Sequence, residues 1–185
     1  MKAKQYSLVA DIGGTNARFA LVADDDRTPI EPRNLAVTDY PGIVQAIHAY
    51  LELVDLGRPY QAAISGASPV TGDQLNMTNH TWSFSVRETR AALDLRHLKV
   101  LNDYTALALA LPVFSESQCR KIGDGEALAG YPMAVIGPGT GLGVSGPLHA
   151  GKHWIPLERE GGHVSYGPVI ARDLQSSVRV RECDE

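Results

Sequence analysis

The sequence predicts an α/β domain whose sheet is largely covered by helices. Short apolar runs typical of strands alternate along the chain with segments in which apolar residues recur at helical spacing. Glycine and proline separate most of these segments. The composition is consistent with a folded core, because 44% of the 185 residues are hydrophobic and 21% are charged.

The chain is expected to begin with a β-hairpin. Residues 6–12 have the pattern of a mostly buried strand, the Gly-Gly pair at 13–14 marks a tight turn, and residues 17–22 are predicted to return beside the first strand. A surface turn is predicted at 24–29 and a third strand at 34–38.

The next segment is predicted to be an amphipathic helix that begins after Gly42, ends near Gly57 and Pro59, and packs on the sheet. Its apolar residues at helical spacing are Ile43, Val44, Ile47, Tyr50, Leu51 and Val54. A short strand is predicted at 61–65. Ser85 is predicted to cap a second helix that reaches about Leu93, because Glu88 follows it at the spacing of a capping box.

The following strand, at 98–101, leads into an apolar helix at 106–111 that Pro112 is expected to stop. A domain boundary is placed near this proline. It divides the chain into an N-terminal α/β domain, residues 1–113, and the beginning of a second domain, residues 114–185. Further strands are predicted in the second part, at 133–136, 144–148 and 153–155.

The first candidate site follows the first strand. Asp11 places a carboxylate at the strand's end, and Gly13 and Gly14 lack the Cβ that would keep an anion from the backbone amides. Thr15 and Asn16 offer further donors. This pattern predicts a phosphate cradle, with Asp11 holding Mg²⁺ through water. An ordinary Gly-Gly hairpin is the structural alternative.

A second glycine-rich segment, residues 137–143, follows another predicted strand and is interpreted as a second phosphate cradle centred on Gly139, Thr140 and Gly141. It is not the dinucleotide fingerprint, because that motif needs glycine where Leu142 stands, and it has no G-K-[ST] of a Walker loop. A flexible turn is the alternative.

Polar residues at two further places suit a sugar. Asn102 and Asp103 stand where a strand ends and a helix begins, so Asp103 is a candidate general base and Asn102 a candidate ligand of a hydroxyl. Helix capping is the alternative for both. Glu160 and His163 flank two glycines and suit adjacent hydroxyls. Trp82 is predicted to be a core residue.

Composition excludes several classes of protein. With 17 basic and 21 acidic residues the net charge is −4, and no dense basic stripe points to nucleic acid. No stretch approaches the ~20 apolar residues that cross a bilayer. The N-terminus lacks the apolar core of a signal peptide, and Cys119 and Cys183 form no C-x-x-C pair. We therefore expect a cytoplasmic protein with free thiols, without nucleic-acid or membrane partners.

Five segments taken in order resemble the bacterial glucokinase family, over roughly residues 6–164. They are DIGGTNAR at 11–18, MTNHTWSF at 77–84, LNDYTA at 101–106, GPGTGLGV at 137–144 and EGGHV at 160–164. The resemblance implies an actin-like, ribonuclease-H-like ATPase fold with a mixed sheet, in which ATP and glucose meet between two domains.

The same resemblance implies a role for each site. Asp103 would be the base for the glucose 6-hydroxyl, with Asn102, Glu160 and His163 binding the sugar. The two glycine loops would bind the ATP phosphates, and Asp11 would belong to the Mg²⁺ site. The implied function is ATP-dependent phosphorylation of D-glucose to glucose 6-phosphate.

The family continues beyond the matched motifs through the rest of a large second domain. We therefore expect an incomplete second domain, a truncated or frame-altered terminus at 175–185, and weak or absent turnover by the isolated chain. Exposed apolar surface would favour a homodimer or another association. Two alternatives stay open: a non-catalytic sugar- or nucleotide-binding remnant, and another sugar kinase of the same fold.

Overall fold

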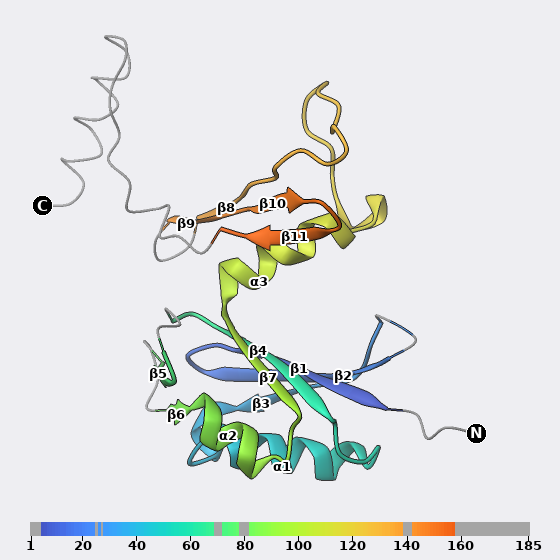
Figure 1. Ribbon diagram of the computed structural model, residues 1–185. Coiled ribbons are helices and arrows are strands. Elements are labelled where there is room, and N and C mark those ends of the chain that lie inside the picture. Colours follow the sequence, from blue (N-terminus) through green and yellow to red (C-terminus); the bar gives the residue numbers. More distant parts are fainter. Residues whose placement is uncertain are drawn as a thin grey trace, which may run out of the picture.

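The computed structural model describes residues 5–24, 26, 28–68, 72–77, 82–138 and 142–157. Its largest sheet has five strands in the order β3-β2-β1-β4-β7 (Figure 1). β1, β4 and β7 are parallel neighbours, whereas β2 pairs antiparallel with both β1 and β3. The strands are β1 (Tyr6–Ile12), β2 (Asn16–Ala23), β3 (Pro29–Ala36), β4 (Gln61–Gly66) and β7 (His97–Asn102).

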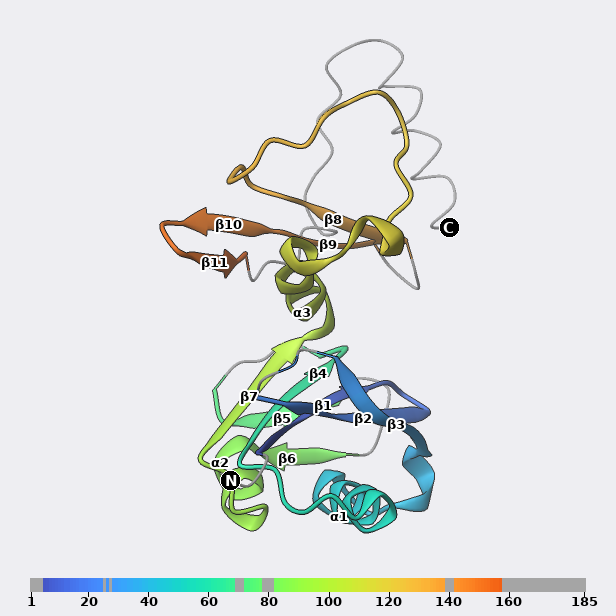
Figure 2. The ribbon, with the colours of Figure 1, turned by 90° about the vertical axis from the view of Figure 1, so that its right-hand side faces the viewer.

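Two helices, α1 (Ile43–Val54) and α2 (Val86–Ala92), lie on one side of this sheet (Figures 1 and 2). Side chains alternate across a strand, and Leu8 and Ile12 of β1 therefore share a buried cluster with Ile47 of α1. The rings of Phe19 and Tyr50 stack in the same cluster with centroids 5.4 Å apart. Val9 and Asp11 of β1 alternate with these core residues and face the opposite side of the sheet.

A small hairpin of β5 (Gln74–Asn76) and β6 (Ser83–Ser85) closes one end of this core. Trp82 is 3% exposed, and its indole Nε1 donates a hydrogen bond to the Tyr40 carbonyl at 3.1 Å. The prediction that Trp82 is a core residue is therefore confirmed. The Ser85 hydroxyl accepts a hydrogen bond from the Glu88 amide, which confirms the predicted cap of α2.

The chain leaves the sheet through α3 (Asp103–Ala110), which contacts β4 and β7 on one side and the later strands on the other (Figure 2). Short 3-10 turns at Leu111–Val113 and Glu116–Gln118 follow α3, as one at Val37–Asp39 follows β3. The later strands form two hairpins, β8 (Val135–Pro138) with β9 (Leu142–Ser145) and β10 (Pro147–Ala150) with β11 (His153–Pro156).

Several predicted boundaries differ from those of the structure, and the strand predicted at 133–136 is observed at Val135–Pro138. The third strand begins at Pro29, inside the predicted turn, because it pairs along most of β2. α3 begins at Asp103 because Asn102 caps it, and Pro112 lies in the 3-10 turn instead of stopping a helix at Leu111. The single strand predicted at 144–148 is two strands, divided at Gly146.

Among the residues described, no helix combines the length and apolar character that crossing a membrane requires. The Cys119 thiol is free and exposed.

Candidate functional site

The register of the parallel strands brings two predicted sites to one edge of the sheet. Ile12 is aligned with Gly66, and Gly66 is aligned with Asn102. The turn after β1 and the start of α3 therefore leave the sheet at the same level. With strands about 4.8 Å apart, they are separated by roughly 10 Å across β4. The carboxyl ends of parallel strands are the usual place for ligands in α/β proteins.

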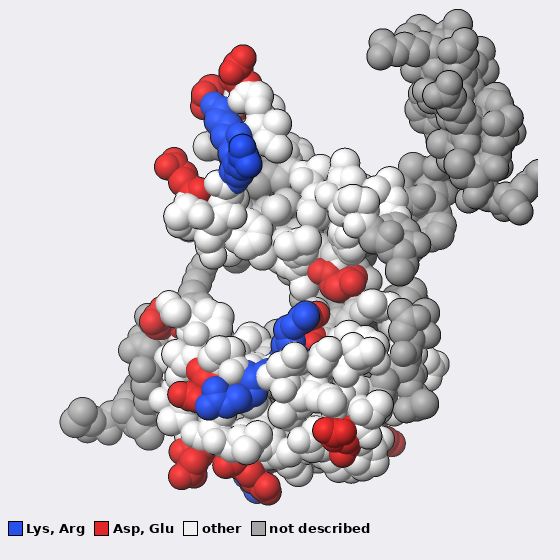
Figure 3. Space-filling view, turned by 180° about the vertical axis from the view of Figure 1, so that it is seen from behind, with Lys and Arg blue, Asp and Glu red and all other residues white. Residues whose placement is uncertain are grey.

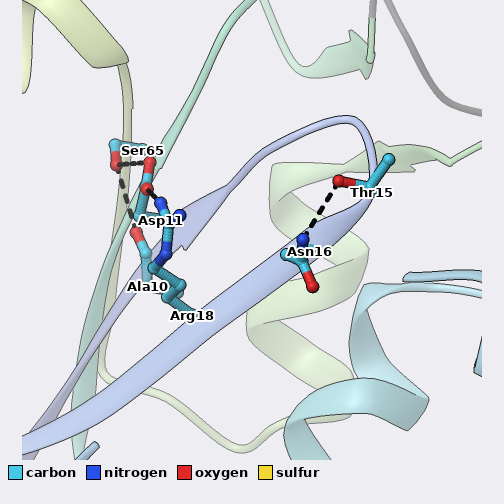
Figure 4. A network of polar contacts seen from close by, with 6 residues as sticks. All are labelled: Ala10, Asp11, Thr15, Asn16, Arg18 and Ser65. Carbon is cyan, nitrogen blue, oxygen red and sulfur yellow. Dashed lines mark hydrogen bonds and ion pairs between the residues drawn. The ribbon is translucent and has the colours of Figure 1, made fainter. Parts of the chain in front are cut away.

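Both carboxylate oxygens of Asp11 are held by neighbouring side chains (Figure 4). Arg18 Nη1 lies 3.0 Å from Oδ2 and Ser65 Oγ lies 3.1 Å from Oδ1. Ser65 also contacts the carbonyl of Ala10 at 3.3 Å. The Asp11 side chain remains 47% exposed, and its lone pairs are not all engaged. This half-exposed carboxylate fits Mg²⁺, which one carboxylate, water and substrate phosphates commonly hold.

The Gly-Gly turn keeps only part of the predicted phosphate cradle. The Gly13 amide donates a hydrogen bond to the carbonyl of Asn16 at 2.9 Å and closes the hairpin. The prediction that this amide donates to an anion is therefore not met, because the amide is already engaged. Gly14 and Thr15 are exposed, and within the described chain their amides have no hydrogen-bond partner. Asn16 Nδ2 donates to Thr15 Oγ1 at 3.0 Å and orients that hydroxyl (Figure 4).

Asn102 combines the capping and the ligand interpretations. Its Oδ1 accepts hydrogen bonds from the amides of Tyr104 at 3.0 Å and Thr105 at 3.3 Å, which makes it the N-cap of α3. Capping fixes the carboxamide. Its Nδ2 finds no acceptor among the described residues and is therefore available to a ligand.

Asp103 is the first residue of α3 and is half-buried. One carboxylate oxygen, Oδ1, accepts a hydrogen bond from the Tyr104 amide at 2.8 Å. Amides at the helix N-terminus favour a negative charge there. Within the described residues the second oxygen has no hydrogen-bond partner, so it is free to accept a proton from a bound hydroxyl.

The surface beside Asp11 is hollow, and this hollow does not include Asn102 or Asp103 in its lining. A hollow of about 490 Å³ is lined by Asp11, Arg18, Asn34 and Ser65, among others. Seen from behind, the molecule is also hollowed between the part built on the five-stranded sheet and the part that carries the hairpins, with acidic and basic side chains beside the opening (Figure 3). A larger hollow of about 610 Å³ includes Ser7, Gln61 and His97 in its lining. These residues stand at the amino ends of β1, β4 and β7, opposite to the edge that carries Asp11 and Asn102.

The remaining predicted site residues lie outside the described residues. These are Gly139, Thr140, Gly141, Glu160 and His163. Arg18 and Ser65, which hold Asp11, are not among the predicted site residues. The position of Arg18 opposite Asp11 follows from the register of a hairpin with a four-residue connection, but no pattern in the sequence aligns Ser65 of β4 with Asp11.

The fold and the paired sites define a class of protein, the actin-like ATPases to which sugar kinases belong. The matches are consistent with this class. The family model described as Glucokinase matches residues 8–182. The chain therefore belongs to the glucokinase family.

The relatives show how much of that family the chain represents. It is 48% identical over 169 residues to a glucokinase of Aromatoleum aromaticum, an alignment that covers 91% of this chain and 51% of the relative. The chain thus spans about half the length of that curated relative.

Solved structures agree on the fold. A glucokinase from an Antarctic psychrotroph superposes with a TM-score of 0.87 at 33% identity, over 96% of this chain and 57% of that one. A ROK family glucokinase from Streptomyces griseus, solved with glucose and AMPPNP, gives 0.56 at 22% identity, over 81% of this chain and 46% of that one.

Proposed function

We propose that this chain carries the centre of an ATP-dependent glucose phosphorylation site. The observation that carries the proposal is the alignment of β1, β4 and β7, which sets the Asp11 turn and the Asn102-Asp103 pair at one edge of the sheet. One of these sites suits phosphate and the other suits a hydroxyl. Phosphoryl transfer needs a phosphate and a hydroxyl held side by side. It asks for little covalent chemistry from the protein, because catalysis consists mainly of positioning and charge stabilisation.

Asp103 acts as the general base. Its second carboxylate oxygen takes the proton of the glucose 6-hydroxyl as that oxygen attacks the γ-phosphorus of ATP. The bond from O6 to phosphorus forms while the bond from phosphorus to the β,γ-bridging oxygen breaks, so ADP leaves and the proton stays on Asp103. The Tyr104 amide, 2.8 Å from Oδ1, keeps the carboxylate oriented.

The turn after β1 binds the phosphates. The exposed amides of Gly14 and Thr15 donate to phosphate oxygens, and the side chains of Thr15 and Asn16 add further donors. Asp11 holds Mg²⁺ through water, and Arg18 and Ser65 hold Asp11 in place. Bound Mg²⁺ would neutralise charge on the phosphates. Gly139, Thr140 and Gly141 supply the second phosphate loop.

Glucose is held by Asn102, Glu160 and His163. The capped carboxamide of Asn102 turns its Nδ2 toward a sugar hydroxyl, while the glutamate accepts hydrogen bonds from adjacent hydroxyls. Hydroxyl-specific recognition by fixed polar groups is efficient because a missing partner leaves a buried polar group unpaired. The specificity for glucose rests on the family, whose named members include glucokinases.

The two proposed domains, 1–113 and 114–185, move together around the bound substrates and exclude water from the transfer. The protein acts in the cytoplasm, where ATP is available and thiols such as Cys119 stay reduced. Apolar side chains exposed on the β8–β11 hairpins, including Ile136, Leu142 and Ile155, favour association with a second copy or with further chain.

Thermal unfolding of the purified chain with glucose and with Mg·ATP, each added alone, tests this proposal. Both ligands are expected to raise the midpoint, and a coupled assay for glucose 6-phosphate then measures turnover. Stabilisation by neither ligand contradicts the proposal and leaves a structural remnant. Stabilisation by glucose alone contradicts the kinase role and leaves sugar binding. A larger rise of the unfolding midpoint, or faster turnover, with another hexose than with glucose indicates another sugar kinase of the same fold.

A further inference from the structure

Tyr104 links the proposed base to the glycine-rich hairpin. It follows Asp103 in α3 and is half-buried. Its amide donates to Asp103 Oδ1 at 2.8 Å, and its side-chain hydroxyl donates to the carbonyl of Gly137 at 2.8 Å, 33 residues further along the chain. One residue thus contacts both the catalytic carboxylate and the stem of the second phosphate loop.

Two glycines of that stem make room for the Tyr104 ring. Gly137 of β8 and Gly143 of β9 are paired directly across the hairpin. A Cβ added at Gly143 would overlap the ring carbons Cζ, Cε1 and Cε2 of Tyr104, and a Cβ at Gly137 would overlap its hydroxyl oxygen. Both overlaps are with the Tyr104 side chain, whose hydroxyl is bound to the Gly137 carbonyl, so an added Cβ would have to displace the ring from this contact. Both glycines therefore have a packing role that the phosphate interpretation did not include.

The Tyr104 side chain is anchored at both ends, by its backbone in α3 and by its hydroxyl on the Gly137 carbonyl. The helix N-terminus is fixed by the Asn102 cap, whose Oδ1 accepts from the amides of Tyr104 and Thr105. A tyrosine side chain has only two rotatable bonds before its ring. Once its backbone and its hydroxyl are both fixed, the ring has little freedom, and the distance between α3 and Gly137 is set. The connection between β8 and β9 is residues 139–141, the predicted second phosphate loop.

We propose that Tyr104 is a positioning residue that holds the stem of the glycine-rich hairpin, at Gly137 and Gly143, at a fixed place relative to Asp103. This inference rests on the proposed function, in which the connection of that hairpin, residues 139–141, binds the ATP phosphates. The ring on Gly143 supports the stem, and the hydroxyl on Gly137 fixes its register. Tyr104 itself does not contact the reacting atoms.

A cycle of variants tests the contact. Gly143→Ala is expected to lower the unfolding midpoint by about 5 °C, because the added methyl overpacks against the ring. In a Tyr104→Ala background, where the ring is gone, the same methyl is expected to cost little. Gly125→Ala is the matched control, because a Cβ at Gly125 meets nothing within 4 Å and its φ is not positive. Equal losses from Gly143→Ala in both backgrounds overturn the proposed contact.

A second measurement separates positioning from packing. Tyr104→Phe keeps the ring and removes the hydrogen bond to Gly137, and titration calorimetry gives the Kd values for Mg·ATP and for glucose. We expect the Mg·ATP Kd to rise roughly 3- to 10-fold, as one hydrogen bond warrants, and the glucose Kd to change by less than about twofold. Tyr131→Phe, at an exposed tyrosine, is the control.

The outcomes distinguish this inference from the function on which it rests. If the unchanged chain binds Mg·ATP and Tyr104→Phe binds it equally well, the positioning role is overturned and the proposed function stands. If Tyr104→Phe weakens both ligands equally, the role is a general structural one and the inference is again overturned. If the unchanged chain does not bind Mg·ATP, the proposed function fails and the inference fails with it.

Discussion

Replacing Asn102 separates its capping role from its proposed sugar contact. Asn102→Ala removes the acceptor of two helix amides, but the Tyr104 amide keeps Asp103 Oδ1 as a partner at 2.8 Å. The Thr105 amide has no such substitute, and Thr105 is 4% exposed. One amide is therefore left unsatisfied, and we expect a loss of about 1 kcal/mol in the free energy of unfolding, near the middle of the range for caps.

Asn102→Ser provides the matched variant. Serine is as good an N-cap as asparagine, so the free energy of unfolding is expected to stay within about 0.5 kcal/mol of the unchanged chain. Serine does not carry the carboxamide Nδ2, which we assign to a glucose hydroxyl. The Kd for glucose is therefore expected to rise roughly 3- to 10-fold in both variants.

Urea unfolding followed by circular dichroism measures the stability, and titration calorimetry measures the Kd for glucose. A loss of stability in Asn102→Ser as large as that in Asn102→Ala refutes the capping role. Glucose binding by Asn102→Ser that is as tight as binding by the unchanged chain refutes the sugar contact.

Three further predictions concern the core, the pH dependence and the phosphate site. Ile47→Ala is expected to lower the free energy of unfolding by about 2–5 kcal/mol in chemical denaturation, because Ile47 is fully buried. Leu53→Ala, at a 61% exposed site, should lower it by less than about 0.5 kcal/mol. Equal losses in the two variants contradict the assigned core. The hydrogen bond from the Ser85 hydroxyl lowers the pKa of Asp73, so its stabilisation is present above the unfolded pKa of about 3.9 and is lost as the pH falls through the lower folded value. Unfolding midpoints between about pH 2 and 5 should therefore depend less on pH in Asp73→Asn, and an unchanged profile contradicts this. Asp11→Asn should weaken Mg·ATP binding about 10-fold in calorimetry and leave glucose binding unchanged, and an unchanged Mg·ATP affinity removes Asp11 from the site.

Local patterns predict much of the first part of the fold. The hairpin follows from two alternating strands around Gly-Gly, and its register then pairs Asp11 with Arg18. The 3.6-residue period predicts α1 and its start at Ile43, although the helix ends at Val54, before the expected end near Gly57. The cap at Ser85 is equally local, because donor and acceptor are three residues apart. Each of these features depends on neighbours that are close in the sequence.

Contacts between distant segments are not predictable in this way. The register that sets Ser65 beside Asp11 depends on how β4 docks, and 54 residues separate the two side chains. At Gly146, where the predicted strand is divided, the backbone of Met133 approaches too closely for a Cβ, a contact between segments that the local sequence does not reveal. The glycines at 137 and 143 suggested a phosphate loop in the sequence, whereas the fold also uses them to seat the Tyr104 ring.

The central claim is that the Asp103 carboxylate receives the proton of the glucose 6-hydroxyl. The most direct test compares the Kd values of glucose and 6-deoxyglucose in the unchanged chain and in Asp103→Ala. A hydrogen bond to a charged carboxylate is expected to make glucose bind roughly 10- to 100-fold more tightly than 6-deoxyglucose in the unchanged chain, and the two sugars should bind nearly equally in Asp103→Ala. A ratio that is the same in both proteins, or a ratio near one in the unchanged chain, contradicts the claim.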